Sequence, residues 1–237
     1  MTTVAIMQPY FFPYGGYYRL LAAADVFVIL DDVQFPRRGR VHRSALSGDG
    51  RWITLPLVAA PRDSLICEMR LAGDAAERLR PQFRKLPVAM RTDTPLRRRI
   101  AELLESPEGA LVPFLAETLR ITAESLGFDC RICRSSHLHV PQGLPAQERI
   151  IEIVRSLGGD RYINAPGGTA LYDRASFLRS GIELAFLTDY TGLHRHFFPA
   201  IFEADTAELR ADIMETCAFR PPPDDDAATG QSGVMHE

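Results

Sequence analysis

Two short apolar runs stand near the start of the chain, at residues 4–7 and 26–30. Each is long enough for a buried strand, and the second is rich in β-branched residues. Between them lie an aromatic loop, the pair Gly15-Gly16 and a stretch of helix-like sequence. A strand, a loop, a helix and a strand in roughly 30 residues predict a βαβ unit with a parallel sheet. Because both runs are apolar throughout, we expect the sheet to be covered on both faces.

The same patterns predict a second βαβ unit and several helices. Residues 161–164 and 182–187 are predicted strands around a helix at 171–180. Apolar residues at spacings of three and four predict further helices at 74–86, 95–104, 111–126, 145–157 and 207–219. Other short strands are expected at 51–58, in a hairpin with 41–46, and at 65–71 and 129–139. Residues 189–199 are expected to be a loop.

These elements predict an α/β fold, a Rossmann-like three-layer domain with a mainly parallel sheet and a helical insertion. We expect residues 1–219 to form this single domain, with the helical segment at about residues 74–127. Residues 220–237 are polar and proline-rich, and we expect a disordered tail there.

The candidate chemistry follows from where the strands end. Ligands of open parallel sheets bind beyond the carboxyl ends of the strands. The first strand is followed by Gln8 and Tyr10, beside a glycine-led helix start whose free N–H groups favour anions, and the second is followed by Asp31 and Asp32. We therefore predict Gln8, Asp31 and Asp32 as catalytic candidates, with substrate or anion contacts from the tyrosines of the aromatic loop, Tyr10, Tyr14 and Tyr17.

Further candidates lie in segments that should reach the same edge. The basic loop with Arg38 and Arg43 is either solvated or an anion clamp. Ser135 and Ser136 end a predicted strand, and Arg149 lies in the first turn of a predicted helix, where a surface role is the alternative. Gly167 and Gly168 open the second unit's helix, where backbone N–H groups suit a phosphate or carboxylate. A tight turn would also require glycine there.

Two patterns invite a metal hypothesis and are set aside. Cys130 and Cys133 are followed by histidines, but residues three apart in a strand face opposite sides of a sheet. We interpret them as structural cysteines. His194 and His196 have no evident third ligand in the sequence. Phe11 and Phe12 are expected to be core residues beneath the first helix.

Composition excludes several classes of protein. The 237 residues are 46% hydrophobic and 24% charged, with a net charge of −3 and a pI near 6.1, so no general attraction to nucleic acid or membrane is expected. No apolar run is long enough to span a membrane, and the chain begins with a strand rather than a signal segment. We expect a cytoplasmic protein. Lys85 is the only lysine, so an anion clamp would be built from arginines.

The motifs at the start of the chain also resemble those of a known protein family. The runs Met7-Gln-Pro-Tyr-Phe-Phe-Pro-Tyr-x-Gly-Tyr17 and Ala24-Asp-x-Phe-Val-Ile-x-Asp-Asp-Val-Gln34 closely resemble the start of WbqC-like proteins. These are bacterial proteins associated with surface-polysaccharide (O-antigen) gene sets. The resemblance continues over most of the chain, at Arg38-Gly39, Arg43, residues 52–56, Ser135-Ser136, Arg149, residues 162–164 with Asn164, and Gly167-Gly168-x-x-Leu-Tyr172. The segment at 197–205 departs from the family's usual tail.

The resemblance implies an α/β fold, a cytoplasmic location and a role in polysaccharide or nucleotide-sugar modification. It adds Asn164 and Tyr172 to the predicted ligand contacts. The most concrete activity it implies is transfer of an acyl or aminoacyl group, such as glycyl, onto an amino sugar. We expect direct transfer, with Asp31 or Asp32 deprotonating the amine and arginines holding phosphates. The donor, the acceptor, any cofactor and the oligomeric state stay open.

Two alternatives come from other classes of protein. The geometry also resembles Rossmann-like nucleotidyltransferases, in which a His-x-Gly-His motif stands where this chain has Tyr14-Gly-Gly-Tyr17. Arg19, Arg38 or Arg43 would then stabilise the transition state. A non-catalytic binding or assembly protein is the other alternative, with exposed aromatics of residues 10–18 as its interaction surface.

Overall fold

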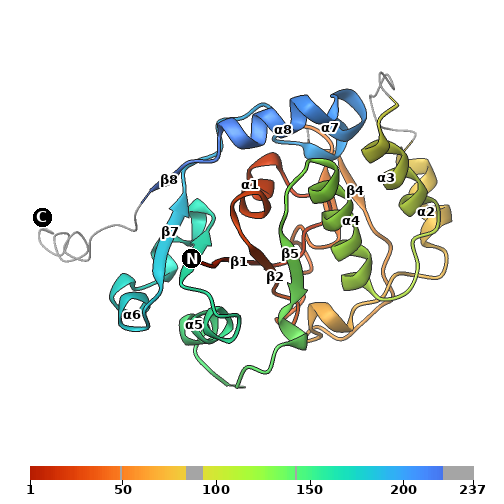
Figure 1. The fold of residues 1–237 in the computed structure, drawn as a ribbon. Helices are drawn as coiled ribbons and strands as arrows, with labels where there is room; N and C mark the ends of the chain where they lie inside the picture. The colour runs from red at the N-terminus through yellow and green to blue at the C-terminus, as the bar shows by residue number, and fades with distance from the viewer. Residues whose placement is uncertain (49, 84–92, 142, 221–237) are drawn as a thin grey trace, which may run out of the picture.

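The central feature of the protein is a mostly parallel sheet (Figure 1). The computed structural model describes residues 1–48, 50–83, 93–141 and 143–220. Within these residues the sheet has six strands, in the order β5-β2-β1-β6-β7-β8. Their bounds are β1 Thr3–Met7, β2 Val26–Ile29, β5 Arg131–Arg134, β6 Arg161–Asn164, β7 Glu183–Leu187 and β8 Phe219–Arg220. All neighbours pair in parallel except β7 and β8, which are antiparallel.

The sheet is wound in two directions from its centre. β1 pairs with β2 on one side, with Val4 opposite Val26, and with β6 on the other, with Val4 opposite Tyr162. The chain continues outward from β2 to β5 and from β6 to β7. The winding direction therefore reverses between β1 and β6, which makes a topological switch point where such folds bind ligands. Gln8 follows β1 there, and Asn164 ends β6.

Helices cover both faces of the sheet, as the apolar strands predict. Ala5 and Phe27 face a cluster formed with α1 (Gly15–Ala23), α4 (Leu111–Ser125), α7 (Phe197–Glu203) and α8 (Thr206–Glu215). Val4 and Val26 face a second cluster, formed with α5 (Ala146–Ser156) and α6 (Arg174–Arg179). Figure 1 shows α5 and α6 on the opposite side of the sheet from α1 and α8. The predicted three-layer, Rossmann-like α/β fold is confirmed.

The insertion between β2 and β5 is largely helical. It contains the hairpin β3 (Arg43–Ala45) and β4 (Trp52–Thr54), the 3₁₀ turn η1 (Ile66–Glu68), and helices α2 (Ala75–Phe83), α3 (Pro95–Glu105) and α4. The hairpin and these helices were predicted, although residues 84–86 of the first predicted helix lie outside the described residues. Apolar residues of α3 and α4 join the cluster on the α1 side of the sheet.

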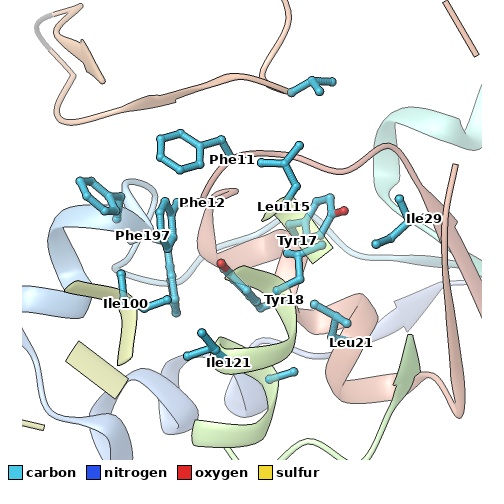
Figure 2. Close-up of a cluster of buried hydrophobic side chains, with 14 of the residues drawn as sticks. Phe11, Phe12, Tyr17, Tyr18, Leu21, Ile29, Ile100, Leu115, Ile121 and Phe197 are labelled. Carbon is cyan, nitrogen blue, oxygen red and sulfur yellow. The ribbon is translucent and has the colours of Figure 1, made fainter. Parts of the chain in front are cut away.

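The aromatic loop before α1 is divided between core and cavity. Phe11 and Phe12 are buried as predicted, and Figure 2 shows them in the same buried cluster as Phe197 and Tyr18. Phe12 has φ 44°, the one positive value that a non-glycine residue takes in the described part of the chain. Such a conformation is strained for a bulky residue. It is held by packing against the tilted ring of Phe198, at 4.6 Å between ring centroids, and by Ser44 Oγ donating to the Phe12 carbonyl at 2.8 Å.

Several predicted boundaries are wrong because tertiary contacts override local pattern. The strand predicted at 129–139 ends at Arg134, and η2 (Ser135–His137) follows, since its serines turn back to contact Asp31. The stretch 65–71, predicted as a strand, holds η1 instead. The helix predicted at 171–180 begins at Arg174, where Asp173 accepts from two backbone N–H groups, and η3 (Pro166–Leu171) precedes it.

The carboxyl-terminal part also differs from prediction. Residues 189–199 were predicted as a loop, but α7 begins at Phe197 because Phe197, Phe198 and Ile201 are buried in the core. The helix predicted at 207–219 ends at Glu215, and β8 follows. Residues 221–237 of the predicted tail lie outside the described residues. No helix in the described segments is long and apolar enough to cross a membrane.

Candidate functional site

A cavity of about 1050 Å³ opens at the switch point between β1 and β6. That volume is slightly above the usual range for ligand pockets, roughly 300–1000 Å³. Eight of the predicted site residues line it: Gln8, Tyr10, Tyr14, Tyr17, Asn164, Gly167, Gly168 and Tyr172. Five other polar residues line it that were not predicted as site residues: Arg40, Asp189, Tyr190, Arg195 and His196.

The β1 side of the cavity combines an amide with phenols. Tyr17 is buried, and its hydroxyl donates to the Gln8 carbonyl oxygen at 2.8 Å, while the Gln8 side chain makes no hydrogen bond within the described residues. Burial raises the pKa of Tyr10, Tyr14 and Tyr17, although the charge of Arg40 opposes this for Tyr10 and Tyr14. These phenols therefore stay protonated at neutral pH and can donate hydrogen bonds.

The β6 side is built on close packing of a glycine against an amide. Asn164 Oδ1 accepts from the Ala165 N–H at 2.7 Å. A Cβ on Gly168 would lie 2.5 Å from Asn164 Nδ2, so only glycine lets η3 lie against that amide. A Cβ on Gly167 would meet open space. Tyr172 packs edge-on against Tyr162, with ring centroids 5.7 Å apart, and completes this wall.

The loop at residues 189–196 closes the third side and lies against the start of α1. The Tyr190 ring occupies the space that side chains on Gly15 and Gly16 would fill. The Gly15 N–H, predicted to be free for an anion, donates instead to the His194 carbonyl at 2.9 Å. The glycine pair therefore admits the loop, and this part of the anion-binding prediction is wrong.

The loop is pinned at both ends to helices. The Tyr190 hydroxyl donates to Asp212 of α8, and the Leu193 N–H donates to the same carboxylate at 2.7 Å. Arg19 of α1 is fully buried and donates to the carbonyls of Thr188 at 2.9 Å and Thr216 at 2.6 Å. These contacts fix Asp189, Arg195 and His196 at the cavity.

Six polar side chains that do not line the cavity form a separate network at the ends of β2 and β5. Asp31 is fully buried and accepts from Arg134 Nε at 2.7 Å, Ser136 Oγ at 2.8 Å and the Ser136 N–H at 2.9 Å. Ser135 Oγ lies 3.2 Å from Asp31 and also contacts Asp32. Asp32 forms an ion pair with Arg149 of α5.

This network leaves Asp31 no open side toward a ligand. Both of its carboxylate oxygens have donors, and each acid faces an arginine. The catalytic role of Asp31 and Asp32, and the ligand contacts of Ser135, Ser136 and Arg149, stay predictions. What the structure shows is a polar network that joins β2, η2 and α5.

The two predicted arginines of the basic loop also lie apart from the cavity lining. Arg43 Nε donates to the Gly39 carbonyl at 3.1 Å, its Nη2 contacts the Arg38 carbonyl, and its guanidinium lies 4.5 Å from the Trp52 ring. Arg38 is exposed. In this loop it is Arg40 that lines the cavity.

The model of the WbqC-like protein family matches residues 8–205, from the end of β1 to the residue before α8. The chain belongs to the WbqC-like protein family. An uncharacterized protein of Mycobacterium tuberculosis is 24% identical over 216 residues, which cover 85% of this chain and 90% of that protein. No solved structure matches the chain.

The structure also bears on the alternatives considered for this WbqC-like protein. The aromatics of residues 10–18 are core or cavity wall, because Phe11, Phe12, Tyr17 and Tyr18 are buried and Tyr10 and Tyr14 line the cavity. They therefore do not form an exposed interaction surface. Arg19 was a candidate for stabilising the transition state in the nucleotidyltransferase alternative. Its guanidinium instead donates hydrogen bonds to backbone carbonyl oxygens.

Cys130 and Cys133, which prompted one of the metal hypotheses, lie on opposite faces of the sheet. Cys130 packs against the cluster on the α1 side of the sheet, and Cys133 against the cluster on the α5 side. They face opposite sides, as strand geometry requires. Among the residues that the structure describes, no group of three histidine, cysteine, aspartate or glutamate side chains is placed to hold a metal ion.

The lining residues that were not predicted from the sequence were missed for different reasons. Asp189 follows β7, so the strand-end rule that selected Gln8 and Asp31 also applied to it. His196 was considered only as half of a metal pair. Arg40 and Arg195 stand in loops whose direction no local pattern fixes.

Proposed function

We propose that this WbqC-like protein is a transferase that moves an acyl or aminoacyl group, such as glycyl, onto the amine of a nucleotide-linked amino sugar in surface-polysaccharide biosynthesis. The observation that carries the proposal is the cavity at the switch point, lined by two amides, protonated phenols and charged side chains. A site of this size with convergent polar groups is the usual form of a small-molecule site. The polysaccharide setting rests on the family resemblance.

The chemistry of the lining favours direct transfer. Among the described residues that line the cavity there is no cysteine or serine to form a covalent intermediate. The amine nitrogen would attack the carbonyl carbon of the donor, and the bond to the leaving group would break. The nitrogen loses one proton, and the leaving group takes up one. A single side chain that accepts and returns a proton is therefore sufficient.

His196 is the residue we assign to this proton transfer. At neutral pH the lining offers two side chains that can accept a proton, Asp189 and His196, because its phenols are protonated and its arginines charged. Histidine both accepts and returns a proton near neutral pH. Asp31 is the other candidate for the base that deprotonates the amine. Both of its carboxylate oxygens already accept hydrogen bonds within the protein.

The test is a transfer assay on the purified full-length chain. UDP-linked amino sugars are incubated with acetyl-CoA, glycyl-CoA or other activated glycine, and the sugar nucleotide is followed by mass spectrometry. We expect the mass to rise by the transferred group, and the rise to be lost in His196→Gln. If no donor gives product although the sugar nucleotide binds, the transferase assignment is wrong.

A further inference from the structure

Two arginines line the cavity without a carboxylate partner in the described parts of the chain, Arg40 and Arg195. Arg40 lies 5.5 Å from the Trp52 ring. Arg195 Nη2 has a long contact of 3.5 Å with the Tyr190 carbonyl. By contrast Arg134 and Arg149, at the neighbouring strand ends, each face an aspartate. A guanidinium that lines a cavity without a counter-ion is placed to bind an anionic ligand.

Both arginines line the cavity together with Tyr14 and Tyr190. These two rings are 6.0 Å apart in an edge-to-face arrangement. Burial raises the pKa of Tyr14, while the charges of Arg19 and Arg40 lower it, and Arg40 lines the cavity together with this phenol. Arg195 contacts the backbone of Tyr190 itself. The two arginines therefore reach one cavity from loops more than 150 residues apart in sequence.

The charged side chains that line the cavity are mostly positive. Arg40 and Arg195 each bring a positive charge to the lining, and Asp189 brings a negative one. Arg19 is held by backbone carbonyls. The lining thus has an excess of positive charge, with protonated phenols at Tyr10 and Tyr14 as further donors. Two guanidinium groups suit a ligand with two adjacent phosphates, because each can donate two parallel hydrogen bonds to one phosphate.

We propose that Arg40 and Arg195 bind the diphosphate of a nucleoside diphosphate-linked ligand. The assignment rests on the proposed function, and it names the part of the substrate that these two arginines would bind. The amides of Gln8 and Asn164, at the ends of β1 and β6, are then left for the sugar. Trp52 holds Arg40 in place through its ring.

The experiment is calorimetric titration of the full-length chain with UDP, UMP and uridine, and with dTDP, CDP and GDP in parallel. We expect the best nucleoside diphosphate to bind at least 10-fold more tightly than its monophosphate, and its affinity to fall as salt is added. Arg40→Ala and Arg195→Ala should each weaken it by about 10- to 100-fold, the usual effect of losing a charged hydrogen bond.

Arg38→Ala is the matched control, because Arg38 is exposed in the same loop as Arg40 and does not line the cavity. The Arg38→Ala variant should bind the diphosphate with the same affinity as the wild type, and thermal melting should show that all variants are folded. Equal affinity for nucleoside and diphosphate, no binding of any diphosphate, or equal losses in Arg38→Ala and Arg40→Ala would each overturn the assignment.

The outcomes separate this assignment from the transferase proposal. Arginine-dependent diphosphate binding without any transfer would support the diphosphate site and reject the transferase. Transfer that persists with unchanged KM in Arg40→Ala and Arg195→Ala would reject the diphosphate site and keep the transferase.

Discussion

Two groups of polar side chains lie at the carboxyl edge of the same sheet, and they differ in how their charges are satisfied. At the ends of β2 and β5, Asp31 and Asp32 each face an arginine, and the serines of η2 fill the remaining positions. At the ends of β1 and β6, the Gln8 amide, Arg40 and Arg195 line a cavity and have no such partners among the described residues.

The difference shows which group is available for a ligand. Buried charges are costly unless they are paired and hydrogen-bonded, so the first group is saturated and contributes to the fold. Polar groups that are left open must be satisfied by water or by a ligand. A dense run of acids in a sequence is therefore a weaker sign of a binding site than unpaired polar groups around a cavity.

The largest effect should come from Asp31→Ala. Removing one partner of a buried ion pair leaves Arg134 and the serines of η2 unsatisfied, and we expect the free energy of unfolding to fall by about 3–5 kcal/mol. Urea denaturation would measure it, with exposed Asp129→Ala as the control. If Asp31→Asn instead kept wild-type stability and abolished turnover, the acid would be catalytic and the contrast between the two groups would fail.

On the cavity side, His196→Gln should lower kcat about 100-fold, at the low end for loss of a general acid–base, with the melting temperature unchanged. His194→Gln is the matched control, because His194 stands in the same loop and does not line the cavity. Equal rates for the two variants would remove His196 from the reaction.

Asp212→Ala tests the anchoring of the loop that carries Asp189, Arg195 and His196. Asp212 accepts hydrogen bonds from the Tyr190 hydroxyl and the Leu193 N–H, so we expect a loss of about 2 kcal/mol of stability and a severalfold loss of UDP affinity. Glu215→Ala, exposed on the same helix, should change neither. A stability loss with unchanged affinity would show that the loop keeps its position without this anchor.

The smallest effect is expected for Arg43→Ala. Its contacts with Trp52 and two loop carbonyls should be worth about 0.5–1 kcal/mol of stability, and UDP affinity should not change. Arg40→Ala should show the reverse, with little change in stability and weaker binding. Weakened UDP binding in Arg43→Ala would place this arginine at the ligand after all.

Much of the fold was predictable because its signals are local. The apolar runs that became β1 and β2, the short strand patterns of β6 and β7, and the spacing of apolar residues in α3 and α4 are properties of short segments. α7 was missed since its helical turn is stabilised by burial of Phe197 and Phe198 rather than by capping residues. η2 was missed because its serines bond to an acid about a hundred residues earlier in the chain.

The sequence by itself determined the edge of the sheet where the cavity lies, and it selected Gln8 and the glycines at 167–168. Strand ends and tight turns can be predicted because they depend on short stretches of sequence. Only the tertiary structure decided that Arg40, Arg195 and His196 face that cavity. Their loops are placed by long-range contacts, such as Gly15 with His194 and Tyr190 with Asp212, which no local pattern encodes. The same long-range pairing gave Asp31 its partners and so closed it to a ligand.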